Sequence, residues 1–128
     1  MGVLTENGMT TVAETFLNRC KEARDIAIRY ADKLKIKEIY VFGSTARGRP
    51  QTQSDVDLMF LIEGDLQDVE NVRDFILTDL SENYEDKYPR VDAHACRYDK
   101  FYGDCSGGTI FDDFMCVIRE EGICIWTR

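Results

Sequence analysis

The sequence predicts an α/β fold in which a mixed β-sheet of about four strands is covered by helices. Short runs rich in β-branched and aromatic residues alternate with longer segments whose apolar residues recur every three or four positions. One short run, 58–62, is apolar throughout, as a strand buried on both faces is. A chain of 128 residues can bury a core but leaves no room for a second large domain, so we expect a single domain over 1–128.

The first half of the chain predicts one long helix and two strands. Apolar residues from Val12 to Leu34 recur at helical spacing, which indicates an amphipathic N-terminal helix at about 10–34 that covers one sheet face. Strands are expected at 38–42 and 56–62. The polar, proline-marked loop 49–53 between them indicates a hairpin-like connection.

The second half continues the alternation of helix and strand. The expected elements are, in order, a helix at 66–80, a strand at 91–97, a helix at 111–118 and a strand at 123–126. Gly122 is expected to end the last helix. The domain is thus predicted to have a core at about 36–97 and a C-terminal helix and strand at about 110–127.

Two aspartates stand at the start of the apolar strand. Asp55 and Asp57 are two residues apart, so in a strand their side chains point to one face, with Cα atoms about 6.6 Å apart. Carboxylates gathered at the end of a buried strand repel each other, and divalent cations relieve that repulsion. A solvent-facing Asp-x-Asp needs no such ligand, but the buried strand here favours a Mg2+ site completed by substrate phosphates.

A third carboxylate would complete a site with two Mg2+ ions, which lie roughly 3.5 to 4 Å apart in two-metal enzymes. Asp92 is the best candidate because it lies on the predicted strand 91–97. If that strand lies beside the Asp55 strand, Asp92 completes a triad and acts as general base or metal-bound activator. The competing aspartates lie in loop-like or helical contexts; they are Asp99, Asp104, Asp112 and Asp113.

A glycine–serine step follows the first predicted strand. Gly43 lets the backbone turn and approach a ligand, and Ser44 can cap a short helix whose N–H groups bind phosphate oxygens. Arg47 adds a planar cation that suits a triphosphate. A Walker loop is excluded because no Gly-Lys-Ser/Thr follows. Taken alone, the Gly43-Ser44 step would indicate only an ordinary strand-to-helix turn.

Three sequence blocks together resemble the DNA polymerase beta-like nucleotidyltransferase superfamily, and more narrowly the minimal nucleotidyltransferases. The blocks are Gly43-Ser44-x-Ala46-Arg47-Gly48, Ser54-Asp55-x-Asp57-Leu58 and Val91-Asp92. The chain departs from the usual pattern at His94, where relatives continue with apolar residues. The resemblance implies the small nucleotidyltransferase fold and ATP or another nucleoside triphosphate as substrate.

The resemblance also implies roles for individual residues. The implied nucleotide-binding residues are Gly43, Ser44, Arg47 and Ser54, and the implied metal-binding and catalytic residues are Asp55, Asp57 and Asp92. Minimal nucleotidyltransferases of this kind are often encoded with a small helical HEPN-type partner, as antitoxin to its toxin. The implied reaction is therefore transfer of AMP from ATP to a hydroxyl group of a partner protein, with tyrosine as the expected acceptor.

Two other functions remain open from the sequence. The chain could be a binding module, an antitoxin that neutralises its partner by contact while the metal site is vestigial or regulatory. It could also transfer nucleotides to a small molecule such as an aminoglycoside, whose positive charge suits an acidic surface. The lack of an added acceptor domain argues against the small-molecule function and predicts that a partner protein or a second copy completes the acceptor surface.

Composition excludes several classes of partner. The net charge of -8 and the absence of a large Lys/Arg run argue against nucleic acid as a partner. No apolar run approaches the length of a membrane span and no secretory signal is visible, so we expect a cytoplasmic protein. The five cysteines form no C-x-x-C pair, which predicts neither a zinc site nor a disulfide framework. We expect Cys20, Cys116 and Cys124 to be small core residues and Cys105 to be exposed.

Overall fold

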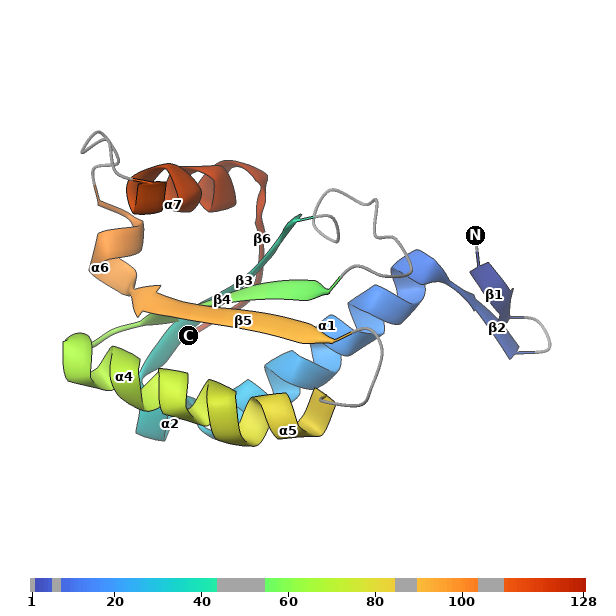
Figure 1. The fold of residues 1–128 in the computed structure, drawn as a ribbon, viewed down its shortest axis with the longest axis horizontal. Coiled ribbons are helices and arrows are strands. Elements are labelled where there is room, and N and C mark those ends of the chain that lie inside the picture. Colours follow the sequence, from blue (N-terminus) through green and yellow to red (C-terminus); the bar gives the residue numbers. More distant parts are fainter. Residues whose placement is uncertain (1, 6–7, 44–54, 85–89, 104–109) are drawn as a thin grey trace.

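The computed structural model places a mixed four-stranded sheet between two layers of helices (Figure 1). It describes residues 2–5, 8–43, 55–84, 90–103 and 110–128. The four strands are β3 (Ile36–Phe42), β4 (Val56–Ile62), β5 (Val91–Arg97) and β6 (Ile123–Thr127), in the sheet order β5-β4-β3-β6. β4 and β5 are parallel, and the other two neighbouring pairs are antiparallel. The predicted α/β fold with a mixed sheet is confirmed.

β4 is a central strand that is covered on both faces. The side chains from Leu58 to Ile62 are all at most 1% exposed. Alternate side chains of a strand point to opposite faces, so a strand between two helical layers needs apolar residues at every position. The unbroken apolar run of the sequence is thus explained by burial on both sides.

One layer of helices lies on the sheet face that carries Leu58 and Phe60. It comprises α1 (Val12–Arg29), α2 (Ala31–Leu34), α4 (Leu66–Phe75) and the π-helical segment η1 (Ile76–Leu80), which α5 (Ser81–Tyr84) continues. The larger buried cluster joins this layer to the sheet and includes Phe16, Val72 and Leu80. The predicted amphipathic helices therefore cover this face.

The second layer lies on the opposite face of the sheet, as Figure 1 shows for α7. It comprises α6 (Tyr98–Phe101) and α7 (Ile110–Glu121). Phe101, Met115 and Ile118 are buried there against Met59 and Leu61 of β4. Gly122 lies between α7 and β6, so the expected end of the last helix is confirmed.

The N-terminal helix is shorter than predicted and is interrupted. Residues 2–11 form an antiparallel hairpin of β1 (Gly2–Thr5) and β2 (Gly8–Thr11), so α1 begins at Val12 rather than at residue 10. Tyr30 separates α1 from α2, and Lys35 closes α2 in the left-handed conformation with a φ of 57°. The apolar periodicity continues across this break because Ala31 and Leu34 still face the core.

Three other elements differ from their predicted bounds. β3 begins at Ile36, two residues earlier than expected, and Ile36 is fully buried. The predicted helix 66–80 continues to Tyr84 and has π geometry at its centre, where the hydroxyl of Ser81 donates to the carbonyl of Ile76 at 2.6 Å. α6 was not predicted, because four residues are too few to show a helical period. Loop 49–53 lies outside the described residues.

The cysteines differ from expectation. Cys116 is disulfide-bonded, so predicting no disulfide framework and a simple core residue at this position was wrong. Cysteine spacing alone could not reveal this bond, because a disulfide forms only where the fold brings two cysteines to a suitable distance and orientation. Cys105, which was expected to be exposed, lies outside the described residues. Cys20 is buried as predicted, whereas Cys124 is exposed on the outer strand β6. Among the described helices, none combines the length and the apolar character needed to cross a bilayer.

Candidate active site

Three strands meet at one edge of the sheet, where the candidate residues lie. β3 runs antiparallel to β4, and β5 runs parallel to β4, so the end of β3 meets the starts of the other two strands. Phe42 is paired with Asp57, and Asp57 is paired with Asp92. Paired residues of neighbouring strands point to the same face, with backbones about 4.8 Å apart. Asp92 thus lies on a strand, as predicted, and the condition that this strand lies beside the one that follows Asp55 is met.

The three aspartates differ in exposure. Asp55 comes directly before β4 and is exposed, and Asp57 is half-buried as the second residue of the strand. The side chain of Asp92 is 53% exposed on β5. The arrangement places one partly desolvated carboxylate between an accessible neighbour along the strand and an accessible neighbour across it. Such a group of oxygens can receive a ligand from solvent.

Gly43 lies against the carboxylate of Asp57. It has a φ of 75°, a conformation that side-chain-bearing residues rarely adopt. A Cβ atom at this position would collide with Oδ2 of Asp57. The turn after β3 therefore needs glycine for two separate reasons, its backbone conformation and the space that Asp57 occupies.

The charge of Asp57 also reaches the core beneath it. Burial, and after it the negative charge of Asp57, raise the pKa of the Cys20 thiol to about 11. Cys20 lies on α1, in the larger buried cluster. Asp57 therefore stands at the boundary between the open edge of the sheet and the packed interior.

The remaining nucleotide-binding candidates lie outside the described residues. They are Ser44, Arg47 and Ser54, all in the segment 44–54 that connects β3 to β4. Gly43 is the described residue that leads into this segment, and Asp55 is the one that follows it. The predicted phosphate-binding turn is thus bracketed by described residues at the sheet edge.

His94 links Asp92 to an aromatic cluster. Its Nε2 lies 3.4 Å from Oδ2 of Asp92. Its ring centroid lies 6.0 Å from that of Phe42 and 5.9 Å from that of Phe114, and the two phenylalanine rings meet edge to face at 5.4 Å. The sequence marked His94 as a departure from the family pattern but did not indicate its phenylalanine neighbours. Phe114 lies on α7, and its helical period indicates only a core position.

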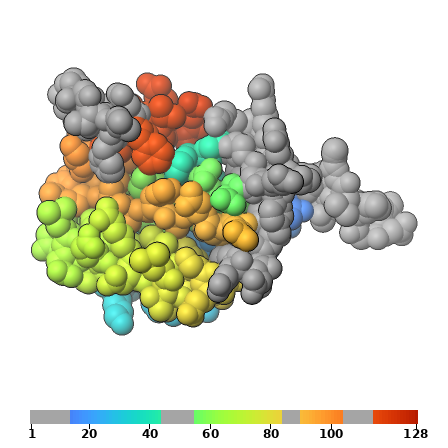
Figure 2. Space-filling model, in the orientation of Figure 1, coloured from blue at the N-terminus to red at the C-terminus, as the bar shows by residue number. Residues whose placement is uncertain are grey.

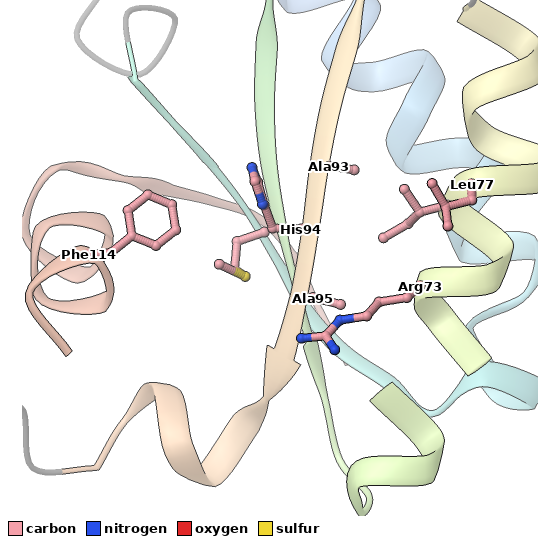
Figure 3. A pocket seen from close by; sticks show the side chains of 8 residues that line it. Arg73, Leu77, Ala93, His94, Ala95 and Phe114 are labelled. Atoms are coloured by element: carbon pink, nitrogen blue, oxygen red, sulfur yellow. The ribbon is translucent and has the colours of Figure 1, made fainter. Parts of the chain in front are cut away.

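A pocket of about 420 Å³ lies beside Asp92 along β5 (Figure 3). His94 and Phe114 line it on one side of the strand, and Arg73, Leu77 and Ala93 line it on the other side. Asp57 does not line this pocket. The pocket therefore adjoins the carboxylates on the Asp92 side and offers space for a group that approaches Asp92.

The three aspartates have the right ligand chemistry for Mg2+, but they form an incomplete set of ligands. Mg2+ in such sites takes one or two carboxylates together with phosphate oxygens and water. Asp57 and Asp92 are paired across neighbouring strands and offer hard oxygen ligands, and Asp55 lies two residues before Asp57 in the chain. Within the described ranges, no group of three or more His, Cys, Asp or Glu side chains is placed to hold a metal ion. The described carboxylates alone would therefore provide only part of a Mg2+ shell, and oxygens of a bound substrate would have to complete it.

A mixed sheet whose edge pairs carboxylates on neighbouring strands beside a glycine turn defines a nucleotidyltransferase-type domain. The comparison with protein families identifies it more closely: the chain belongs to the nucleotidyltransferase domain family, whose model matches residues 20–110. The matched range runs from within α1 to the start of α7 and includes every candidate site residue.

A solved structure supports the fold. The chain is similar to a protein from Sulfolobus solfataricus described as a nucleotidyltransferase, with a TM-score of 0.58 and 22% identity over 93% of this chain and 89% of that one. A weaker similarity, with a TM-score of 0.45 and 18% identity, is to a chain from a crystal structure of a toxin-antitoxin with AMP-PNP; it covers 83% of this chain and 73% of that one. No curated protein sequence matches this chain.

Proposed function

We propose that this nucleotidyltransferase domain transfers AMP from ATP to a hydroxyl group of a partner protein, with Mg2+ as cofactor. The observation that carries the proposal is the pairing of Asp57 with Asp92 across β4 and β5, beside the turn at Gly43. Two carboxylates on neighbouring strands, at a partly exposed edge of the sheet, repel each other. A bound cation offsets that repulsion, and the substrate phosphates complete the shell.

Each candidate residue has a distinct task in this proposal. Asp55 and Asp57 hold Mg2+, with Asp92 as the further ligand, and Gly43, Ser44, Arg47 and Ser54 hold the triphosphate. Mg2+, when bound, withdraws negative charge from the phosphate oxygens. A carboxylate oxygen of Asp92 accepts the proton of the acceptor hydroxyl. The hydroxyl oxygen then forms a bond to the α-phosphorus, the bond from the α-phosphorus to the bridging oxygen breaks, and pyrophosphate leaves.

The open side of Asp92 supports a large acceptor. Asp92 is exposed, and a pocket lies beside it along β5. A hydroxyl group presented by another protein can reach such a position. The resemblance to minimal nucleotidyltransferases makes a HEPN-type protein the partner to test, with a tyrosine hydroxyl as the acceptor.

The test uses the purified chain, the protein encoded by its neighbouring gene, Mg2+ and ATP labelled at the α-phosphate. We expect label on the partner, and we expect Asp57→Asn and Asp92→Asn to abolish it while EDTA prevents it in the native chain. Asp74→Asn, on the exposed surface of α4, is the matched control and should label normally.

Two outcomes would contradict the proposal. A partner that is bound and inhibited but never labelled would indicate a contact antitoxin. Label that persists at the native rate in Asp57→Asn would remove the carboxylate pair from the reaction. Mass spectrometry of the modified partner identifies the added group and the residue that carries it, which separates AMP transfer from transfer of the terminal phosphate.

A further inference from the structure

β5 forms one edge of the described sheet, and its outer side is unpaired within the described ranges. The N–H of Val56 donates to the carbonyl of Arg90 at 2.8 Å, so Arg90 is directed towards β4. In a strand, successive residues direct their N–H and C=O groups to alternate sides. The backbone groups of Val91, Ala93 and Ala95 are therefore directed away from β4, as an exposed template for another strand.

This edge has few of the devices that protect sheet edges. Natural edges are covered, shortened, or given charged residues, prolines and bulges. β5 is seven residues long and pairs with β4 in unbroken register from Val56↔Val91 to Ile62↔Arg97. Among its outward-directed residues only Arg97, at the end, is charged. Figure 2 shows β5 at the surface, between α4 and α5 on one side and α7 on the other.

Two pockets with a shared lining residue form a groove along β5, beside α4 and η1. The pocket of about 420 Å³ lies at its Asp92 end, and a second pocket of about 250 Å³ continues along α4. Arg73 lines both pockets and so joins them. Leu66 and Leu77, which are 70% and 72% exposed, lie at opposite ends of the groove and give it an apolar rim.

The groove is lined by cationic side chains, although the protein is strongly negative overall. Arg73, Arg97 and Lys100 line it, and no Asp or Glu lines either pocket, although the chain has a net charge of -8. Glu70 contacts Arg73 at 2.7 Å and Asp99 contacts Arg97 at 2.5 Å, but neither carboxylate lines the groove. Nε of Arg97 is buried without a hydrogen-bond partner among the described residues, so its guanidinium is incompletely satisfied.

We propose that the groove along β5 binds an extended, acidic segment of the partner protein, which adds to the sheet as a further strand. Main-chain hydrogen bonds to Val91, Ala93 and Ala95 would supply affinity, and the cations of the groove would select acidic side chains. Asp92 lies on the same strand, so the docked segment would lead the partner's hydroxyl towards the carboxylates. The inference rests on the proposed function only in naming the partner as the acceptor; the binding itself requires no nucleotide.

The strand edge favours a peptide over other occupants. Nucleic acid binds through phosphate neutralisation and base stacking and leaves the outward backbone groups of β5 unpaired. If a second copy added its own β5 edge, the same cationic side chains would face each other across the pairing, so this edge is not complementary to itself. An acidic segment of a different protein matches both the backbone pattern and the charge.

The test measures peptide binding to the full 15N-labelled chain by NMR, without nucleotide. The probe is a capped seven-residue peptide of alternating glutamate and valine, and its counterpart has lysine in place of glutamate. We expect the acidic peptide to shift the amide signals of Val91, Ala93 and Ala95 and to bind at least about tenfold more tightly than the lysine peptide. Arg73→Glu should weaken the acidic peptide about tenfold, whereas Arg29→Glu on α1 should leave it unchanged.

A proline variant tests the backbone contacts separately. Ala93→Pro removes an outward N–H and no bond to β4, so the fold is retained and peptide binding falls. Leu77→Glu on the groove rim should also weaken binding, and Leu17→Glu, an equally drastic change at an exposed leucine of α1, should not.

Four outcomes would each overturn the inference. The β5 amide signals do not shift, or the two peptides bind with equal affinity. A single-stranded oligonucleotide displaces the peptide, or the chain associates with itself through β5 as its concentration rises. Peptide binding by a chain that does not label its partner would contradict the proposed function instead.

Discussion

Oδ2 of Asp57 lies too close to Gly43 to leave room for a Cβ atom on that residue. Gly43→Ala therefore forces the Asp57 carboxylate away from its position and also strains a backbone with a φ of 75°. We expect the strain to cost about 1 kcal/mol of stability. We expect nucleotidyl transfer to fall roughly 100-fold, because displacing a reacting group by about 1 Å has an effect of that size.

Gly64→Ala is the matched control for this prediction. A Cβ atom on Gly64 would meet Oδ2 of Asp68, which is also an aspartate oxygen but lies at the opposite end of β4. Urea unfolding and the labelling assay, measured on both variants, separate stability from activity. Equal losses of activity in the two variants would show that Gly43 acts through the fold alone.

The negative charge at the sheet edge also predicts a ligand-dependent change in stability. A ligand that binds only the folded chain stabilises it by about 2.7 kcal/mol at a concentration 100 times its dissociation constant. MgATP should therefore raise the thermal unfolding midpoint of the native chain, and ATP with EDTA should raise it less. Asp57→Asn should remove the magnesium-dependent part of the rise. Asp25→Asn, at an exposed position of α1, should preserve it, and an unchanged rise in Asp57→Asn would exclude this carboxylate as a metal ligand.

The sequence was sufficient to assign Asp57 and Asp92 to strands because strand signals are local. The apolar run 58–62 predicted a buried strand, and the alternation around Asp92 predicted a second one with the correct bounds. A strand fixes which side chains share a face, so Asp57 and Asp92 could be placed together once β4 and β5 were taken to be neighbours. The family match and the sheet register agree with that arrangement.

The surroundings of the carboxylates could not be predicted in the same way. Phe42, His94 and Phe114 come from three separate elements, and their contact depends on how α7 packs on the sheet. The π-helical segment could not be predicted either, because the spacing of its apolar residues also fits an ordinary α-helix. The N-terminal hairpin escaped prediction because its strands have only four residues each. These features depend on tertiary contacts that local propensity does not report.

The aromatic cluster predicts a measurable coupling between His94 and Phe114. Their rings lie at an interplanar angle of 72°, with centroids 5.9 Å apart. A double-mutant cycle of His94→Ala and Phe114→Ala, measured by urea unfolding, should give a coupling of about 0.5 to 1.5 kcal/mol. Pairing each variant with Leu17→Ala should give additive effects, because Leu17 lies on α1. A coupling below roughly 0.3 kcal/mol would mean that the two rings do not stabilise each other.

Buried thiols predict a loss of stability at alkaline pH. Burial, and to a lesser degree the charge of Asp57, raise the pKa of Cys20 from 9.0 to about 11, and burial raises the pKa of Cys96 to about 12. The folded chain thus holds these protons more tightly than the unfolded chain does. The stabilisation is complete below pH 9 and is lost as the pH rises towards 11, by about 1.4 kcal/mol per pH unit for Cys20.

Urea unfolding of the native chain and of Cys20→Ala between pH 8 and pH 11, without a reductant that would break the Cys116 disulfide, checks this slope. Stability should fall less steeply with pH in Cys20→Ala, because the variant lacks one of the buried thiols. Iodoacetamide labelling at pH 8 gives an independent readout: Cys124 is exposed and should react first, whereas Cys20 and Cys96 should react only after unfolding. Parallel pH profiles for the two chains, or early labelling of Cys20 in the folded protein, would show that Asp57 and the core do not hold this thiol in its neutral form.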